Sequence, residues 1–152
     1  MNFSLIACIN YKFALGKNGK LLYHIKSDLM NFKRMTQDNA VIMGRKTFDS
    51  LPNGALKNRV NIVITNDRSF KADNVIIVHS VEDAMRICEE RYPNLECFVI
   101  GGGKIYEEFL IRNVVNTIYL TIVHDDLDGD THFPIFTQND SFKEFYENPV
   151  IT

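Results

Sequence analysis

The sequence predicts a single α/β domain in which helices flank a mostly parallel, twisted central sheet. Two observations predict it: short runs rich in Val, Ile and Phe alternate with helical patterns, and 152 residues suit one domain with no linker or repeat. Hydrophobic residues make up 45% and charged residues 24%, an ordinary balance for a globular protein. We therefore treat residues 1–152 as one folded unit.

Six apolar runs have the length and composition of buried strands. They cover residues 3–9, 40–43, 60–65, 75–78, 97–100 and 117–123. Helical patterns lie between several of them, at 27–36, 81–92 and 104–111, with a short helical turn at 47–51. Ser27 is the expected cap of the helix at 27–36, and Ser80 is that of the helix at 81–92. The loop at 11–23 is rich in Gly, Lys and Asn and is either a mobile functional segment or an irregular crossover.

The overall charge argues against several classes of partner. A formal charge of -2 and a pI near 6.1 give no general attraction to nucleic acid or anionic lipid. Residues 3–9 are apolar but far shorter than the roughly 18 residues of a membrane span, and no targeting segment is recognisable, so we expect a cytoplasmic protein. Cys8, Cys88 and Cys97 match no zinc or redox spacing and are interpreted as reduced thiols, and no metal site is expected.

Asp28 is the first candidate for chemistry. If Ser27 caps the helix, Asp28 lies in the first turn and on the same side as Phe32, so its carboxylate points toward apolar surroundings. The alternative is an ordinary first-turn acid stabilised by the helix dipole.

Two glycine-containing strand ends are candidates for phosphate binding. Gly101, Gly102 and Gly103 lead from a buried strand into a helix, which suggests a pyrophosphate cradle, although a tight structural turn explains them equally well. Arg45 and Lys46 follow Gly44 and suit a phosphate, and the alternative is a pair of solvated surface cations. Arg68 would add a third charge there if the strands are neighbours.

Other catalytic patterns are not supported. There is no G-x-S-x-G elbow for hydrolysis, and the acids at 125, 126, 128 and 130 do not fit a calcium loop, so we expect a solvated hairpin turn there.

Taken together, six segments resemble the dihydrofolate reductase family in the order in which they occur, from about Phe3 to Pro134. They are 4–7 (SLIA), 16–19 (GKNG), 28–36 (DL with FKR and a threonine), 41–47 (VIMGRKT), 100–106 (IGGGKIY) and 129–134 (GDTHFP). The resemblance implies that a pteridine substrate and NADPH meet at one site of a single-domain fold.

The resemblance also implies a role for each matching residue. Asp28, supported by Thr121, would orient the pteridine, and Arg59 would bind the carboxylate of the glutamate tail. The implied substrate-binding residues are Ile6, Ala7, Asp28, Leu29, Phe32, Lys33, Leu51, Leu56, Arg59, Ile100 and Thr121. Asp28, Tyr23, Leu21 and Thr121 are the implied catalytic residues.

For the cofactor, the resemblance implies a cis peptide bond between the first two glycines and a site for the 2′-phosphate that favours NADPH over NADH. The implied contacts are Ala7, Leu15, Gly16, Gly44, Arg45, Lys46, Thr47, Thr65, Asn66, Arg68, Gly101, Gly102, Gly103, Lys104, Ile105 and Tyr106. The implied reaction is hydride transfer to pteridine C6 with protonation of N5, in tetrahydrofolate biosynthesis and one-carbon metabolism. The implied state is a monomer that binds antifolate-type inhibitors, with residues 15–23 as a lid.

Two features depart from the family pattern. Leu21-Leu22-Tyr23 stands where the family usually has Leu-Pro-Trp, which alters the lid. The chain stops at Thr152, soon after a strand-like segment at 142–146, so we expect a shortened antiparallel edge at the C-terminus. The alternatives are a related pyrimidine reductase of riboflavin synthesis, against which Asp28 and Arg59 argue, and a binding or structural protein of this fold that has lost turnover.

Overall fold

The computed structural model describes residues 2–134 and 144–150. The helices are α1 (Lys26–Thr36), α2 (Arg45–Ser50), α3 (Val81–Arg91) and α4 (Gly103–Ile111). The strands are β1 (Phe3–Asn10), β2 (Ala14–Lys17), β3 (Lys20–Leu21), β4 (Ala40–Gly44), β5 (Val60–Ile64), β6 (Ile76–Val78), β7 (Cys97–Gly101), β8 (Val115–Val123), β9 (Thr131–His132) and β10 (Glu144–Val150).

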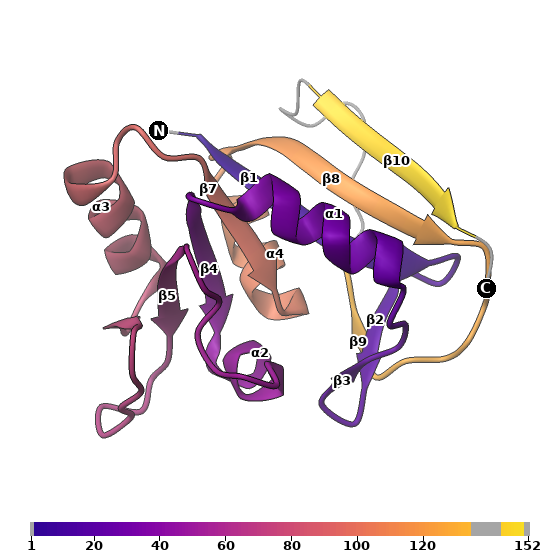
Figure 1. Ribbon diagram of the computed structural model, residues 1–152, viewed down its shortest axis with the longest axis horizontal. Coiled ribbons are helices and arrows are strands. Elements are labelled where there is room, and N and C mark those ends of the chain that lie inside the picture. The colour runs from indigo at the N-terminus through magenta and orange to yellow at the C-terminus, as the bar shows by residue number, and fades with distance from the viewer. Residues whose placement is uncertain (1, 135–143, 151–152) are drawn as a thin grey trace.

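Seven strands form the main sheet, in the order β10-β8-β1-β7-β4-β5-β6 (Figure 1). Every pair of neighbours in it is parallel, so the carboxyl ends of β1, β4, β5 and β7 meet along one edge. Ligands of open α/β sheets bind outside that edge. A second, antiparallel sheet of order β3-β2-β9 lies beside it.

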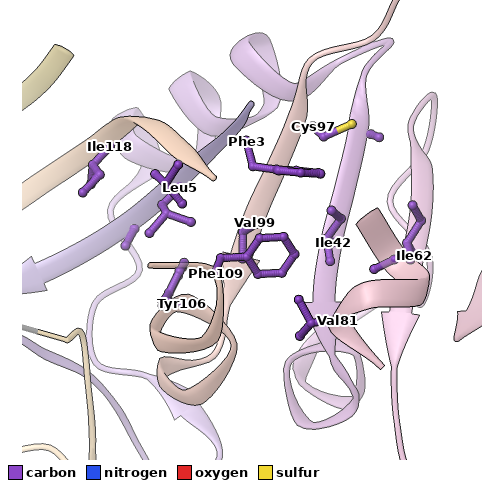
Figure 2. Packing of buried hydrophobic residues seen from close by; sticks show 14 of the residues in the cluster. Phe3, Leu5, Ile42, Ile62, Val81, Cys97, Val99, Tyr106, Phe109 and Ile118 are labelled. Atoms are coloured by element: carbon purple, nitrogen blue, oxygen red, sulfur yellow. The ribbon is translucent and has the colours of Figure 1, made fainter. Parts of the chain in front are cut away.

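Helices cover both faces of the main sheet, as the sequence predicts. On one face, α3 and α4 pack on alternate strand residues, and Phe109 meets Phe3 edge-on with ring centroids 5.2 Å apart (Figure 2). On the other face, Phe32 and Met35 of α1 pack against a smaller cluster around Ile6. Two buried layers therefore fix the sheet between the helices. None of the helices in the described part of the chain is long and apolar enough to cross a membrane.

The predicted elements are confirmed, with ends displaced by one or two residues. The expected Ser80 cap is also confirmed, because its side chain accepts a hydrogen bond of 3.0 Å from the backbone N–H of Asp83. The Ser27 cap is wrong. Helix α1 begins one residue earlier than predicted, at Lys26, so Ile25 occupies the cap position without a side-chain hydrogen bond and Ser27 lies inside the first turn.

Residues 11–23 are more regular than predicted, because β2 and β3 form a hairpin within them. The expected hairpin turn at residues 125–130 is wrong as well. The strands on either side of it belong to different sheets, since β8 pairs with β1 while β9 pairs with β2. Those acids therefore lie on a connection between the sheets, where Lys12 pairs with Asp128 at 2.7 Å and the backbone N–H of Asn18 bonds Asp130 at 3.0 Å.

A C-terminal edge strand is present, but its predicted antiparallel direction is wrong. Strand β10 is parallel to β8, with Glu144 opposite Thr117 and Val150 opposite Val123. It enters the sheet at the same end as β8, which the chain allows because 20 residues (124–143) separate the two strands. The predicted strand at 142–146 lies partly outside the described residues.

We expect Phe109→Ala to lower the free energy of unfolding by about 3–5 kcal/mol, because it empties a fully buried aromatic position between α4 and β1. Urea denaturation measures the change. Ile111→Ala on the same helix is the control, because Ile111 is 72% exposed and its loss should change stability by less than about 0.5 kcal/mol. Similar losses for the two variants would contradict this view of the core.

Candidate functional site

Strands β1 and β7 part near the middle of the main sheet. They pair only through Ser4 with Phe98 and Leu5 with Val99, whereas β1 continues along β8 as far as Asn10. On the other side of β7, the register with β4 shifts after Ile42, which leaves Ile100 out of register. The backbone edges of Ile6 and Ile100 therefore face each other beyond the last β1–β7 pair.

Asp28 lies over this point. Side chains alternate along β1 and β8, and Ile6 and Tyr119 belong to the cluster on the α1 face, so Thr121 is also on that face. The Thr121 hydroxyl donates a hydrogen bond to the Asp28 carboxylate. The structure therefore brings together the two residues that the resemblance pairs, with Asp28 half-buried and Thr121 6% exposed.

Tyr106 is held beneath the same strands. It is 2% exposed, its ring packs on Phe133 at 4.8 Å between centroids, and its hydroxyl donates to the carbonyl of Ile6 at 2.7 Å. Burial raises the pKa of Tyr106 well above its usual value, so the hydroxyl stays protonated. One lone pair of the Ile6 carbonyl is thus already engaged.

The glycine turn after β7 contains a cis peptide bond between Gly101 and Gly102, as the resemblance implies. Gly101 has a φ of +135°, and a Cβ there would lie 3.3 Å from the Thr47 hydroxyl. A Cβ on Gly103 would lie only 2.4 Å from the carbonyl oxygen of His132 in β9. The backbone is therefore in close contact with its neighbours on two sides.

The turn also exposes unbonded backbone donors. Gly102 is the N-cap of α4, and no side chain caps the helix. Since the first N–H groups of a helix have no partner within it, they can bind an anion such as a pyrophosphate. The residues present therefore fit a dinucleotide at this turn.

A cluster of cations follows β4 and β5, but it is partly neutralised. Arg45 forms ion pairs with Asp67 at 2.8 Å and Asp49 at 3.5 Å, and its guanidinium lies 4.5 Å from the ring centroid of Phe70. Hydrogen bonds from Ser69, and then Arg45, hold the pKa of Asp67 below its usual range. Lys46, Asn66 and Arg68 are exposed. This cation pairing was not apparent from the sequence.

Arg59 lies beside Thr36, the last residue of α1. Its guanidinium donates to the Thr36 hydroxyl at 3.1 Å and to the Lys57 carbonyl at 2.9 Å, and burial lowers its pKa. Among the described residues, no carboxylate forms an ion pair with it. Leu29 is 43% exposed and Lys33 is exposed, whereas Phe32, Leu51, Leu56 and Ile100 each pack against the buried cluster that contains Ile6.

Tyr23 ties the hairpin segment to the end of β8. Its hydroxyl donates to Asp125 at 2.6 Å and accepts from the Asn10 amide at 3.1 Å, and that amide also donates to the Leu127 carbonyl at 2.8 Å. Partial burial and the bond to Asp125 raise the pKa of Tyr23. Leu15 is buried at the start of the hairpin, while Leu21 is 48% exposed.

Three residues of this region were missed from the sequence: Cys8, Asn10 and Asp125. Asn10 is 1% exposed, and a polar residue ending an apolar strand is a signal that was available. Cys8 follows Ile6 by two positions, which places both on the same side of β1 as Asp28.

Comparison with known proteins agrees with this geometry. A family model described as "Dihydrofolate reductase" matches residues 2–150. Dihydrofolate reductase from Bacillus subtilis is 36% identical over 136 residues, which is 90% of this chain and 77% of that protein. Dihydrofolate reductase from Staphylococcus haemolyticus is 36% identical over 140 residues, covering 92% and 81%. Dihydrofolate reductase type 3 from Salmonella typhimurium is 36% identical over 137 residues, covering 88% and 79%.

Tyr23→Phe should loosen the hairpin, because it removes the hydroxyl that joins Asp125 and Asn10. We expect a loss of about 1 kcal/mol in the free energy of unfolding, and faster amide hydrogen exchange in residues 11–23. Tyr11→Phe is the control, because Tyr11 is 62% exposed. If both variants exchange at the native rate, the Tyr23 hydroxyl does not hold the segment.

Proposed function

The chain belongs to the dihydrofolate reductase family, and on that premise we propose that it reduces 7,8-dihydrofolate to 5,6,7,8-tetrahydrofolate with NADPH. The observation that carries the proposal is the half-buried Asp28 carboxylate, bonded to Thr121 where β1 and β7 part. A carboxylate in that setting requires a donor-rich partner to remain charged. A pteridine, with an amino group beside a ring nitrogen, has the matching chemistry.

We propose that the pteridine lies across the parted strands. Asp28 would accept two hydrogen bonds from the ring and orient it, and the carbonyls of Ile6 and Ile100 would accept bonds from its edge. A carbonyl oxygen has two lone pairs, so the bond from Tyr106 leaves Ile6 one acceptor position. The apolar side chains of Phe32, Leu51 and Leu56 would enclose the rest of the substrate.

Arg59 would bind the carboxylate of the glutamate tail. Its guanidinium already has two polar contacts but no carboxylate partner among the described residues. A planar guanidinium can donate two parallel hydrogen bonds to a carboxylate. Its partial burial strengthens such a pair because less water screens the charges.

The cofactor would lie along the carboxyl edge of the sheet, with its pyrophosphate at Gly101–Gly103 and the start of α4. Arg45, Lys46, Thr65 and Asn66 would face the 2′-phosphate that distinguishes NADPH from NADH. When bound, the cofactor supplies a hydride to pteridine C6. To bind the 2′-phosphate, Arg45 must either keep its ion pair with Asp67 and bind the phosphate as well, or give up that ion pair.

The protein's own contribution is orientation, charge and exclusion of water. Asp28 favours the protonated pteridine electrostatically, and water admitted to the site would protonate N5. Residues 15–23 would act as the lid, which Tyr23 fastens to Asp125. Turnover of the substrate separates this proposal from a binding protein of the same fold.

Asp28→Asn should lower kcat/KM for dihydrofolate at least about 100-fold, because the amide carries no charge to stabilise the protonated ring. Loss of NADPH absorbance on adding dihydrofolate measures it. Asp38→Asn is the control, since Asp38 is an exposed acid beyond the end of α1. Absence of turnover in the native chain, with NADPH still bound, would favour the binding-protein alternative.

Arg45→Gln should weaken NADPH binding about 10-fold or more while leaving NADH binding nearly unchanged, because only NADPH carries the 2′-phosphate. Cofactor fluorescence titration gives both dissociation constants. Arg86→Gln on α3 is the matched control, since Arg86 pairs only with acids of its own helix in the structure described. If Arg45→Gln weakens the binding of NADPH and NADH equally, the 2′-phosphate binds elsewhere.

A further inference from the structure

We propose that Cys8 is a positioning residue for Asp28: its thiol and the Thr121 hydroxyl together hold the carboxylate that faces the pteridine. The role of Asp28 in this inference rests on the proposed function, whereas the contact between the two side chains does not. Cys8 belongs to none of the expected site residues, and its thiol was interpreted from the sequence as an ordinary reduced cysteine.

The sheet register places Cys8 beside Thr121. The two residues are direct partners in the β1–β8 pairing, so their side chains leave the sheet on the same face. That face is the one covered by α1, since Ile6 on β1 and Tyr119 on β8 both belong to its buried cluster. Thr121 reaches Asp28 from there, and Cys8 occupies the neighbouring position.

The negative charge of Asp28 affects the pKa of the Cys8 thiol, as expected for neighbouring side chains. Burial first, and then the negative charge of Asp28 and a hydrogen bond to its carboxylate, together raise the pKa of Cys8 to about 12. The thiol therefore stays protonated at neutral pH and acts as a donor. A thiol that donates to the carboxylate adds to the hydrogen bond from Thr121 in fixing the orientation of Asp28.

The other titratable groups around the pair have partners of their own. Tyr106 from α4 donates to the Ile6 carbonyl, Tyr23 from the segment before α1 donates to Asp125, and burial raises the pKa of both hydroxyls. Thr121 of β8 does not ionise, and on α1 itself Lys26 is exposed.

The test compares Cys8→Ala with Cys8→Ser, two variants of nearly equal side-chain size that differ in the presence of a donor. Steady-state turnover of dihydrofolate at saturating NADPH gives KM and kcat for both variants and for the native chain. The KM for dihydrofolate should rise about threefold in Cys8→Ala and be restored in Cys8→Ser.

Equal KM values in the two variants would overturn the proposal, because the thiol would then only fill space. If the native chain does not turn over dihydrofolate, or if Cys8→Ala does not fold, alkylation of Cys8 by iodoacetamide at pH 9 decides whether the contact between Cys8 and Asp28 stands. It should be several-fold faster in Asp28→Asn than in the native chain, because removing the charge lowers the pKa of the thiol. An unchanged rate contradicts the coupling, and Cys88 and Cys97, both 0% exposed, are internal controls.

Discussion

The hydrogen bond between Thr121 and Asp28 is the contact on which the site depends, because it joins helix α1 to the main sheet through a charged group. A carboxylate removed from water is unfavourable unless donors replace its hydration. Here Thr121 of β8 provides one such donor. The remaining acceptor capacity of Asp28 is then available to a ligand, in a direction set by the sheet and not by a mobile loop.

The parallel sheet explains why residues so distant in sequence meet. Strands β4, β5 and β7 end at the same edge, so Gly44, Thr65 and Gly101 lie along one line although 57 residues separate the first from the last. β1 reaches that edge too, but it leaves β7 after Leu5. The edge thus brings the ends of β4, β5 and β7 together with the point at which β1 and β7 part.

Much of this arrangement is predictable from local patterns. Apolar runs identify the strands, and the Ser80 cap follows from its spacing to Asp83, because both depend on neighbours in the chain. Features that depend on tertiary contacts are not predictable in this way. The ion pair of Arg45 with Asp67 requires β4 and β5 to be adjacent, and the place of Cys8 requires the β1–β8 register. The direction of β10 is set by a long connection that carries no local signal.

The close approach of Gly103 to His132 links two parts of the molecule that are distant in sequence. Strand β9 contacts the start of α4 through this glycine on one side and pairs with β2 on the other. The hairpin of β2 and β3 and the glycine turn consequently share a common wall. A side chain at position 103 would force the backbone on one side of that wall to shift, so this position sets a limit on how independently the two segments can diversify.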